Sequence, residues 1–211
     1  MVWTRRSLPQ LAPPATTRPR RLIADIARLA VNRRFLSATA TIAGGSSALY
    51  LYLTAAPFLL AGDHGLSARE SGLVLMLIAF ASIAGTFCVA WIDRRRSALL
   101  TGSALIAMAP VLLLAADRTG WHSLPSLLVP MAVLGLGAGI CGPAGIARVL
   151  RSEPGLEGTS TALCGALQMG ASAACAGLFS QVAPIHAATL ALALLAPASL
   201  ALLAAWNEAH C

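Results

Sequence analysis

The 211-residue sequence has few charged residues, few aromatic residues and no lysine. Only 11% of the residues are charged and 5% are aromatic, whereas 57% are hydrophobic and the mean hydropathy is +0.75. This composition is too apolar for a soluble domain of this length, so it excludes a soluble fold. Because a membrane-spanning helix needs about 20 mostly apolar residues, the length allows about six of them.

All 15 basic residues are arginines, and they give the chain a net charge of +7. In a soluble protein this charge would indicate nucleic acid as a partner. Here the arginines form short clusters between apolar windows, where they determine topology and contact anionic lipid head groups. We therefore expect membrane lipid as a partner and no nucleic acid.

The five cysteines lack the spacing of a metal or redox site, because no C-x-x-C pair and no suitably spaced histidine is present. Four of them lie in apolar windows, where small packing residues are expected. The C-terminal Cys211 is not part of a prenylation motif, and the basic N-terminal segment is not followed by a signal-peptide core. We expect no metal, no cofactor and no lipid anchor.

Six apolar windows follow a basic, proline-rich segment of residues 1–34. Within that segment, apolar residues from Leu22 to Ala30 recur at helical spacing opposite charged ones, which predicts an amphipathic helix on the membrane surface. The sequence thus predicts an all-α integral membrane fold, with a six-helix domain at 35–206 and a short tail at 207–211. The expected spans are about 35–61, 71–92, 98–116, 127–150, 158–182 and 184–206.

The arginines are distributed very unevenly between the two ends of these spans. Eight precede residue 35, three are Arg94, Arg95 and Arg96, and two are Arg148 and Arg151, whereas the other end has only Arg69 and Arg118. Basic residues in short loops stay in the cytoplasm, so we expect both termini there and a multi-pass protein of the inner (plasma) membrane. Asp93 beside the arginine run either caps the next helix and pairs with these charges or belongs to a simple topology anchor.

Two catalytic or cofactor patterns are better explained by helix packing. Gly137, Gly139 and Gly142 spell G-x-G-x-x-G, but they lie inside an apolar window and not at a turn from strand to helix. Close helix contact is the expected role of Gly135, Gly139 and Gly142, together with Pro143. Ser172 and His186 on neighbouring spans would differ in depth by about 10 Å, too far for a nucleophile and its base, so we expect no enzyme.

Several short motifs arrive in an order that carries a resemblance. They are Asn32-Arg33-Arg34-Phe35-Leu36, Tyr50 with Tyr52, Ala56-Pro57-Phe58, Gly65-Leu66-Ser67, Pro143, and the run from Gly158-Thr159-Ser160-Thr161-Ala162-Leu163 to Gln168. Over about residues 20–206 the chain resembles the C-terminal half of a major facilitator superfamily transporter of the Bcr/CflA drug-export type. The connection at Arg94 to Arg96 lacks the Phe-Gly usual in that family, and the segment before residue 20 does not resemble a transporter half.

The resemblance implies one bundle of a 3+3 inverted repeat that pairs with an N-terminal six-helix bundle to exchange a drug or small metabolite against protons. The first, second, fourth and fifth spans would surround the cavity, with Tyr50, Thr54 and Gln168 as candidate substrate contacts. A back-bonded hydroxyl or an interhelical hydrogen bond is the other interpretation of these three residues.

No Asp, Glu or Lys lies mid-span, so the chain by itself has no evident proton relay. The family's coupling carboxylates are expected in the N-terminal bundle. The sequence therefore predicts the C-terminal half of a proton-coupled efflux transporter that does not transport alone. The alternative is a non-transporting membrane protein, either a truncated gene product or a scaffold.

Overall fold

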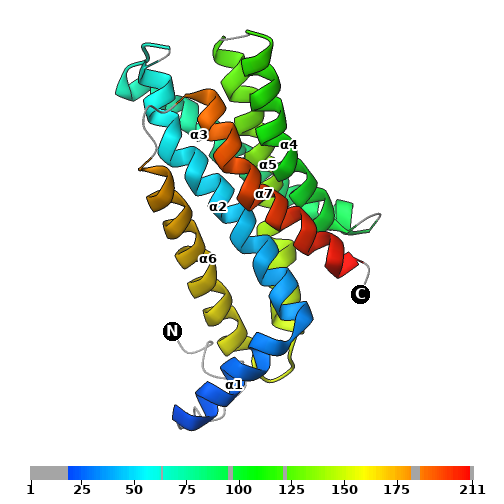
Figure 1. Cartoon of the computed structure of the whole chain (residues 1–211). Coiled ribbons are helices and arrows are strands. Elements are labelled where there is room, and N and C mark those ends of the chain that lie inside the picture. The colour runs from blue at the N-terminus through cyan, green and yellow to red at the C-terminus, as the bar shows by residue number, and fades with distance from the viewer. Residues whose placement is uncertain (1–18, 63, 95–96, 121–122, 182–185, 210–211) are drawn as a thin grey trace, which may run out of the picture.

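The chain forms seven α-helices in the computed structural model, which describes residues 19–62, 64–94, 97–120, 123–181 and 186–209 (Figure 1). No strand occurs within those ranges, so the expected all-α fold is confirmed. The helices are α1 (Pro19–Val31), α2 (Arg33–Gly62), α3 (Ala68–Asp93), α4 (Ala98–Arg118), α5 (Leu124–Arg151), α6 (Glu157–Phe179) and α7 (Ala187–Ala209). The basic tail before Pro19, the arginines at 95 and 96 and the last two residues lie outside the described residues.

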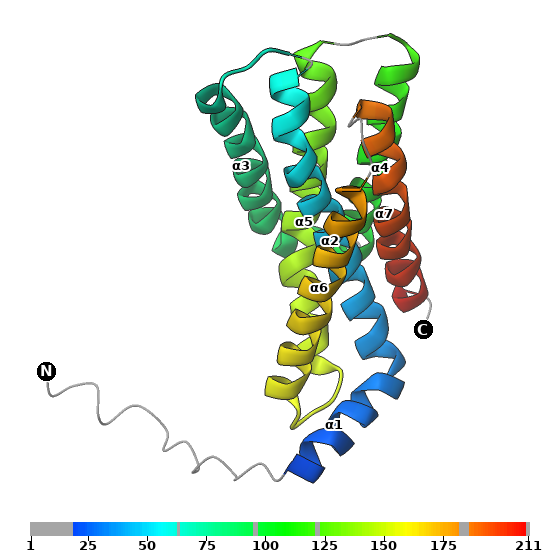
Figure 2. The ribbon, with the colours of Figure 1, turned by 60° about the vertical axis from the view of Figure 1, so that its left-hand side comes forward.

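The six helices from α2 to α7 are each long and apolar enough to cross a membrane. They contain between 21 and 30 residues, which at about 1.5 Å per residue exceeds a hydrocarbon layer of about 30 Å. Successive helices run in opposite directions, so α1 and the end of α7 lie toward the same end of the bundle (Figures 1 and 2).

The helix contacts repeat between the first three and the last three spanning helices. Helix α2 packs on α6 and α7, and its counterpart α5 packs in the same way on α3 and α4. All of these contacts join one half to the other, and two further pairs, α2 with α5 and α4 with α7, join counterparts directly. Because three helices separate each element from its counterpart, the counterparts run in opposite directions, which is a 3+3 inverted repeat.

Local capping determines where several helices begin. Ser67 and Glu70 form a capping box at α3, in which the Ser67 hydroxyl accepts from the Glu70 amide and the Glu70 carboxylate accepts from the Ser67 amide. Ser97 accepts from the amide of Leu100 and caps α4. At α2, the side-chain oxygen of Asn32 accepts hydrogen bonds from the amides of Arg34 and Phe35.

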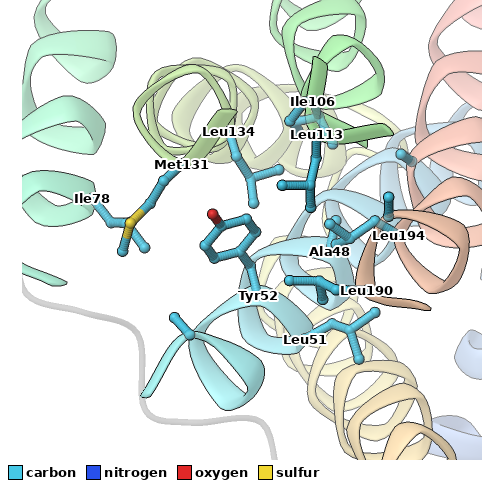
Figure 3. Close-up of a cluster of buried hydrophobic side chains, with 14 of the residues drawn as sticks. Ala48, Leu51, Tyr52, Ile78, Ile106, Leu113, Met131, Leu134, Leu190 and Leu194 are labelled. Carbon is cyan, nitrogen blue, oxygen red and sulfur yellow. The ribbon is translucent and has the colours of Figure 1, made fainter. Parts of the chain in front are cut away.

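The main core lies between α2, α4, α5 and α7, and Tyr52 is at its centre (Figure 3). The Tyr52 side chain is completely buried among aliphatic residues that include Leu113 and Leu134. Its hydroxyl donates to the carbonyl of Leu127 at 2.8 Å, so the one polar atom of this large side chain has a partner. Tyr52 therefore stabilises the bundle and, unlike Tyr50, is not exposed.

Candidate functional site

A stripe of polar residues on α2 is left uncovered by the rest of the bundle. Ser46, Tyr50 and Thr54 are spaced four residues apart, so they lie on one helix face. Tyr50 is 41% exposed and Thr54 is also exposed. The Thr54 hydroxyl donates to the backbone carbonyl of Tyr50 at 2.7 Å, so the hydroxyl has a hydrogen-bonding partner within its own helix.

Gln168 joins this stripe from the neighbouring helix α6. Its side-chain amide donates to the hydroxyl of Ser46 at 2.8 Å, which makes an interhelical hydrogen bond. One helical turn further on, the Ser172 hydroxyl donates to the Gln168 carbonyl at 2.8 Å and lies 3.4 Å from the Ser47 hydroxyl. A polar seam thus runs between α2 and α6, and Gln168 retains one side-chain oxygen for which no partner is described.

The seam borders a small cavity of about 120 Å³ between α2, α5 and α6. Both Ser46 and Gln168 line it, together with apolar side chains and Gly142. Pockets for drug-sized ligands have volumes of about 300–1,000 Å³, so this cavity is at most one part of such a site. The structure therefore brings Gln168 to the cavity, whereas Tyr50 and Thr54 lie on the open face beyond its lining.

Two of the glycines expected at helix contacts lie against α3. A Cβ added at Gly135 would be 2.9 Å from the carbonyl oxygen of Ile78, and one at Gly139 would collide with the carbonyl of Ser82. Gly142 differs from the expectation, because an added Cβ there meets nothing within 4 Å. It faces the cavity, where no helix approaches closely.

Pro143 affects this contact through the backbone. A proline has no N–H, so the carbonyl of Gly139, four residues earlier, loses its normal helical donor. The Thr86 hydroxyl of α3 lies 3.1 Å from this carbonyl oxygen and 3.0 Å from that of Ser82 in its own helix. In membrane helices such freed carbonyls are tolerated where a Ser or Thr side chain supplies the missing hydrogen bond. Thr86 does so here, and the exposed Pro143 ring itself makes no buried contact.

Arg148 joins four helices at the end of the bundle where α7 finishes. Its guanidinium is 3.0 Å from the Glu208 carboxylate of α7, 3.9 Å from Asp93 of α3, and donates to the Ser97 hydroxyl at 3.2 Å before α4. The Glu208 side chain is only 14% exposed and that of Arg148 27%, so this pair is shielded from solvent screening. Asp93 also accepts from the amide of Ala98, which fits the capping role considered for it.

The other arginines of this group have different surroundings. Arg94 and Arg151 are exposed, and Arg95 and Arg96 lie outside the described residues. Glu208 was not among the expected site residues, because it falls in the segment expected to be a tail. Helix α7 continues through Ala209, and the ion pair with Arg148 links this last turn to α5.

The same end of the bundle contains a second polar junction. The Asn32 side-chain amide donates to the carbonyl of Ser152 at 3.0 Å and to the carboxylate of Glu153 at 3.2 Å. Arg28 of α1 lies 3.3 Å from the same carboxylate. These bonds attach the junction of α1 and α2 to the connection between α5 and α6.

The family model of the Major Facilitator Superfamily matches residues 1–176, which include α1 to α5 and most of α6. No curated protein matches the chain. The matched part covers well over half of the chain, and the remaining helix α7 completes the inverted repeat described above. The chain therefore belongs to the Major Facilitator Superfamily and is a multi-pass membrane protein of this family of transporters.

Proposed function

We propose that the chain is the C-terminal six-helix half of a proton-coupled efflux transporter of the Bcr/CflA type. In this proposal it works with an N-terminal six-helix bundle and exports a drug or a small metabolite. The transport path lies between the two bundles, and the open face of α2, with Tyr50, Thr54 and the neighbouring Gln168, contributes one wall of it.

The uncovered polar stripe on α2 is the observation that carries this proposal. If this face of α2 were exposed to lipid, the Tyr50 hydroxyl would have no hydrogen-bonding partner in the hydrocarbon layer, which is unfavourable. Helices α3 and α6 on either side have only four buried residues each, compared with sixteen in α2. A second bundle that covers α3 and α6 would enclose the stripe in a wet cavity.

We place both termini in the cytoplasm of an inner-membrane protein. The described arginines support this orientation, because Arg28, Arg94 and Arg148 lie at one end of the bundle and Arg69 and Arg118 at the other. Alkaline phosphatase fusions test it. Enzyme fused near Asp63 or Asp117 should be active and enzyme fused at Ser152 inactive, and the reverse pattern would overturn the orientation.

Proton coupling is assigned to the partner bundle. Asp25 lies in α1, which is not one of the six spanning helices, and the other described acidic residues lie near the ends of helices or in connections, so none of them is in the middle of a span. The same observation favours the second candidate, a non-transporting membrane protein such as a truncated product or a scaffold.

Export from cells distinguishes the two candidates. The chain is expressed in a drug-sensitive, efflux-deficient host, alone or with the N-terminal six-helix bundle of a Bcr/CflA-type transporter, and gradient-dependent export is measured for a panel of substrates. We expect export only in the second case. Export by the chain alone would contradict its role as a half, and no export from an expressed, associated pair would favour the non-transporting candidate.

A further inference from the structure

A groove of about 570 Å³ separates α2 and α7 at the end of the bundle that holds α1. The two helices touch at Gly44, where an added Cβ would be 2.6 Å from the carbonyl oxygen of Pro197. From this contact they diverge toward the beginning of α2 and the end of α7 (Figures 1 and 2). The groove lies where they have separated.

The walls of the groove change from apolar to basic along its length. Leu36 and Ala40 of α2 face Leu200 and Leu203 of α7, and these two leucines are 51% and 63% exposed. Arg33 and Arg34 line the groove at its outer end. The groove therefore presents a hydrocarbon surface at the depth of the membrane and two cations where that surface ends.

The charge around the basic end is positive even with its one acid included. Glu208 also lines the groove, but its carboxylate is paired with Arg148 at 3.0 Å. An adjoining recess is lined by Arg34, Arg148 and Arg151 together with this same Glu208. An anion that enters from the groove therefore meets Arg33 and Arg34, whereas one oxygen of the Glu208 carboxylate is paired with Arg148 and the other is buried.

We propose that this groove binds an anionic phospholipid, with an acyl chain between α2 and α7 and the phosphate at Arg33 and Arg34. Basic recesses between transmembrane helices are suited to lipid phosphate groups. From Arg33 to Ala40 the rise along α2 is about 10 Å at 1.5 Å per residue, which is long enough to hold the upper part of an acyl chain. A soluble anion would fit the basic end but would leave the exposed leucines uncovered.

The test compares lipid retention by the purified full chain and by two charge variants in detergent, with native mass spectrometry as the readout. Phosphatidylglycerol and phosphatidylcholine with identical acyl chains are added separately. At about fivefold per arginine, Arg33→Gln with Arg34→Gln should weaken phosphatidylglycerol binding roughly 25-fold. The matched control, Arg69→Gln with Arg118→Gln, removes two charges at the opposite end and should change it less than twofold.

A third variant tests the apolar part of the groove without changing its charge. Ala40→Trp fills the space between the helices and should also weaken phosphatidylglycerol binding, while glycerol phosphate, which has no acyl chain, should not compete. Three results would each overturn the proposal. They are an equal loss of phosphatidylglycerol binding in the two double-arginine variants, no loss of that binding in Ala40→Trp, and equal retention of the two lipids by the unmodified chain. If the arginine variant does not fold, the Ala40→Trp result and the comparison of the two lipids still decide it.

Discussion

The hydrogen bond from Thr86 to the carbonyl freed by Pro143 yields a prediction that can be worked out quantitatively. Thr86→Val keeps the shape of the side chain and removes the hydroxyl, so the carbonyl of Gly139 is left without a donor. Side-chain hydrogen bonds between membrane helices contribute about 0.6 kcal/mol on average and up to about 1.7 kcal/mol. Because Gly139 is buried in the contact between α3 and α5, we expect a loss of about 1 kcal/mol.

A double-mutant cycle isolates the contribution of the proline. In Pro143→Ala the backbone N–H of residue 143 is restored and can bond to the Gly139 carbonyl, so Thr86→Val should then cost about half as much or less. Thr101→Val is the matched control. The Thr101 hydroxyl donates to the Ser97 carbonyl, which also accepts from the Thr101 backbone N–H. Removing this hydroxyl therefore leaves no carbonyl without a donor, and the free energy of unfolding should change by no more than about 0.5 kcal/mol.

The free energies of unfolding are measured by titration with a denaturing detergent in mixed micelles, with helix content as the readout. The reasoning predicts a positive coupling energy between Thr86 and Pro143. If Thr86→Val costs the same with proline and with alanine at position 143, the hydroxyl does not replace the missing backbone donor, and this account of Pro143 is wrong.

Three further predictions concern packing, charge and access. Gly139→Ala should destabilise the bundle by about 2 kcal/mol, because the new methyl group collides with α3. Gly142→Ala should be neutral or stabilising in the same unfolding titration, and equal effects of the two variants would refute the packing assignment. Arg148→Gln should lower the free energy of unfolding by about 2 kcal/mol, because it leaves Glu208 unpaired. Arg151→Gln should lower it by less than about 0.5 kcal/mol, and the reverse order would show that the charge cluster does not stabilise the fold. Cysteine introduced at Tyr50 in a cysteine-free background should react with a small water-soluble thiol reagent when the partner bundle is present, and absence of labelling there would mean that the position faces protein or lipid.

The helices could be predicted from the sequence because their signal is local. Long apolar windows and the periodic pattern between Leu22 and Ala30 each act over neighbouring residues, and the structure has a helix at each of them. The small residues Gly135 and Gly139 were also informative, because only a glycine allows two membrane helices to approach so closely. In these cases residue type and spacing sufficed.

The charge cluster could not be predicted, because it depends on contacts between distant parts of the chain. Helix α6 and most of α7 separate Arg148 from Glu208 in the sequence. The two side chains meet at this end because α5 and α7 both pack on α2 and α4. A signal was present in the sequence, since an acid near the end of the last apolar window faces the side rich in arginine. The contribution of Thr86 was equally hidden, because it depends on the register of α3 against α5.

The candidate site was only partly accessible from sequence reasoning for a similar reason. Polar residues within apolar windows drew attention to Tyr50, Thr54 and Gln168, but the sequence did not distinguish an open face from an interhelical hydrogen bond. The structure shows Gln168 bonded to Ser46 at the border of a cavity, while Tyr50 and Thr54 are exposed. In the proposed transporter, which of these side chains touches a substrate would depend on a second bundle, and this sequence gives no information about such a bundle.

Reconstitution tests the central claim, that this chain is one half of a proton-coupled transporter, most directly. The purified chain is placed in vesicles alone, or together with an N-terminal six-helix bundle of the same family, and a pH gradient is imposed while uptake of a labelled substrate is followed. The account predicts gradient-dependent transport only when both bundles are present and its loss when the gradient is collapsed. Gradient-driven transport by the chain alone would contradict the account.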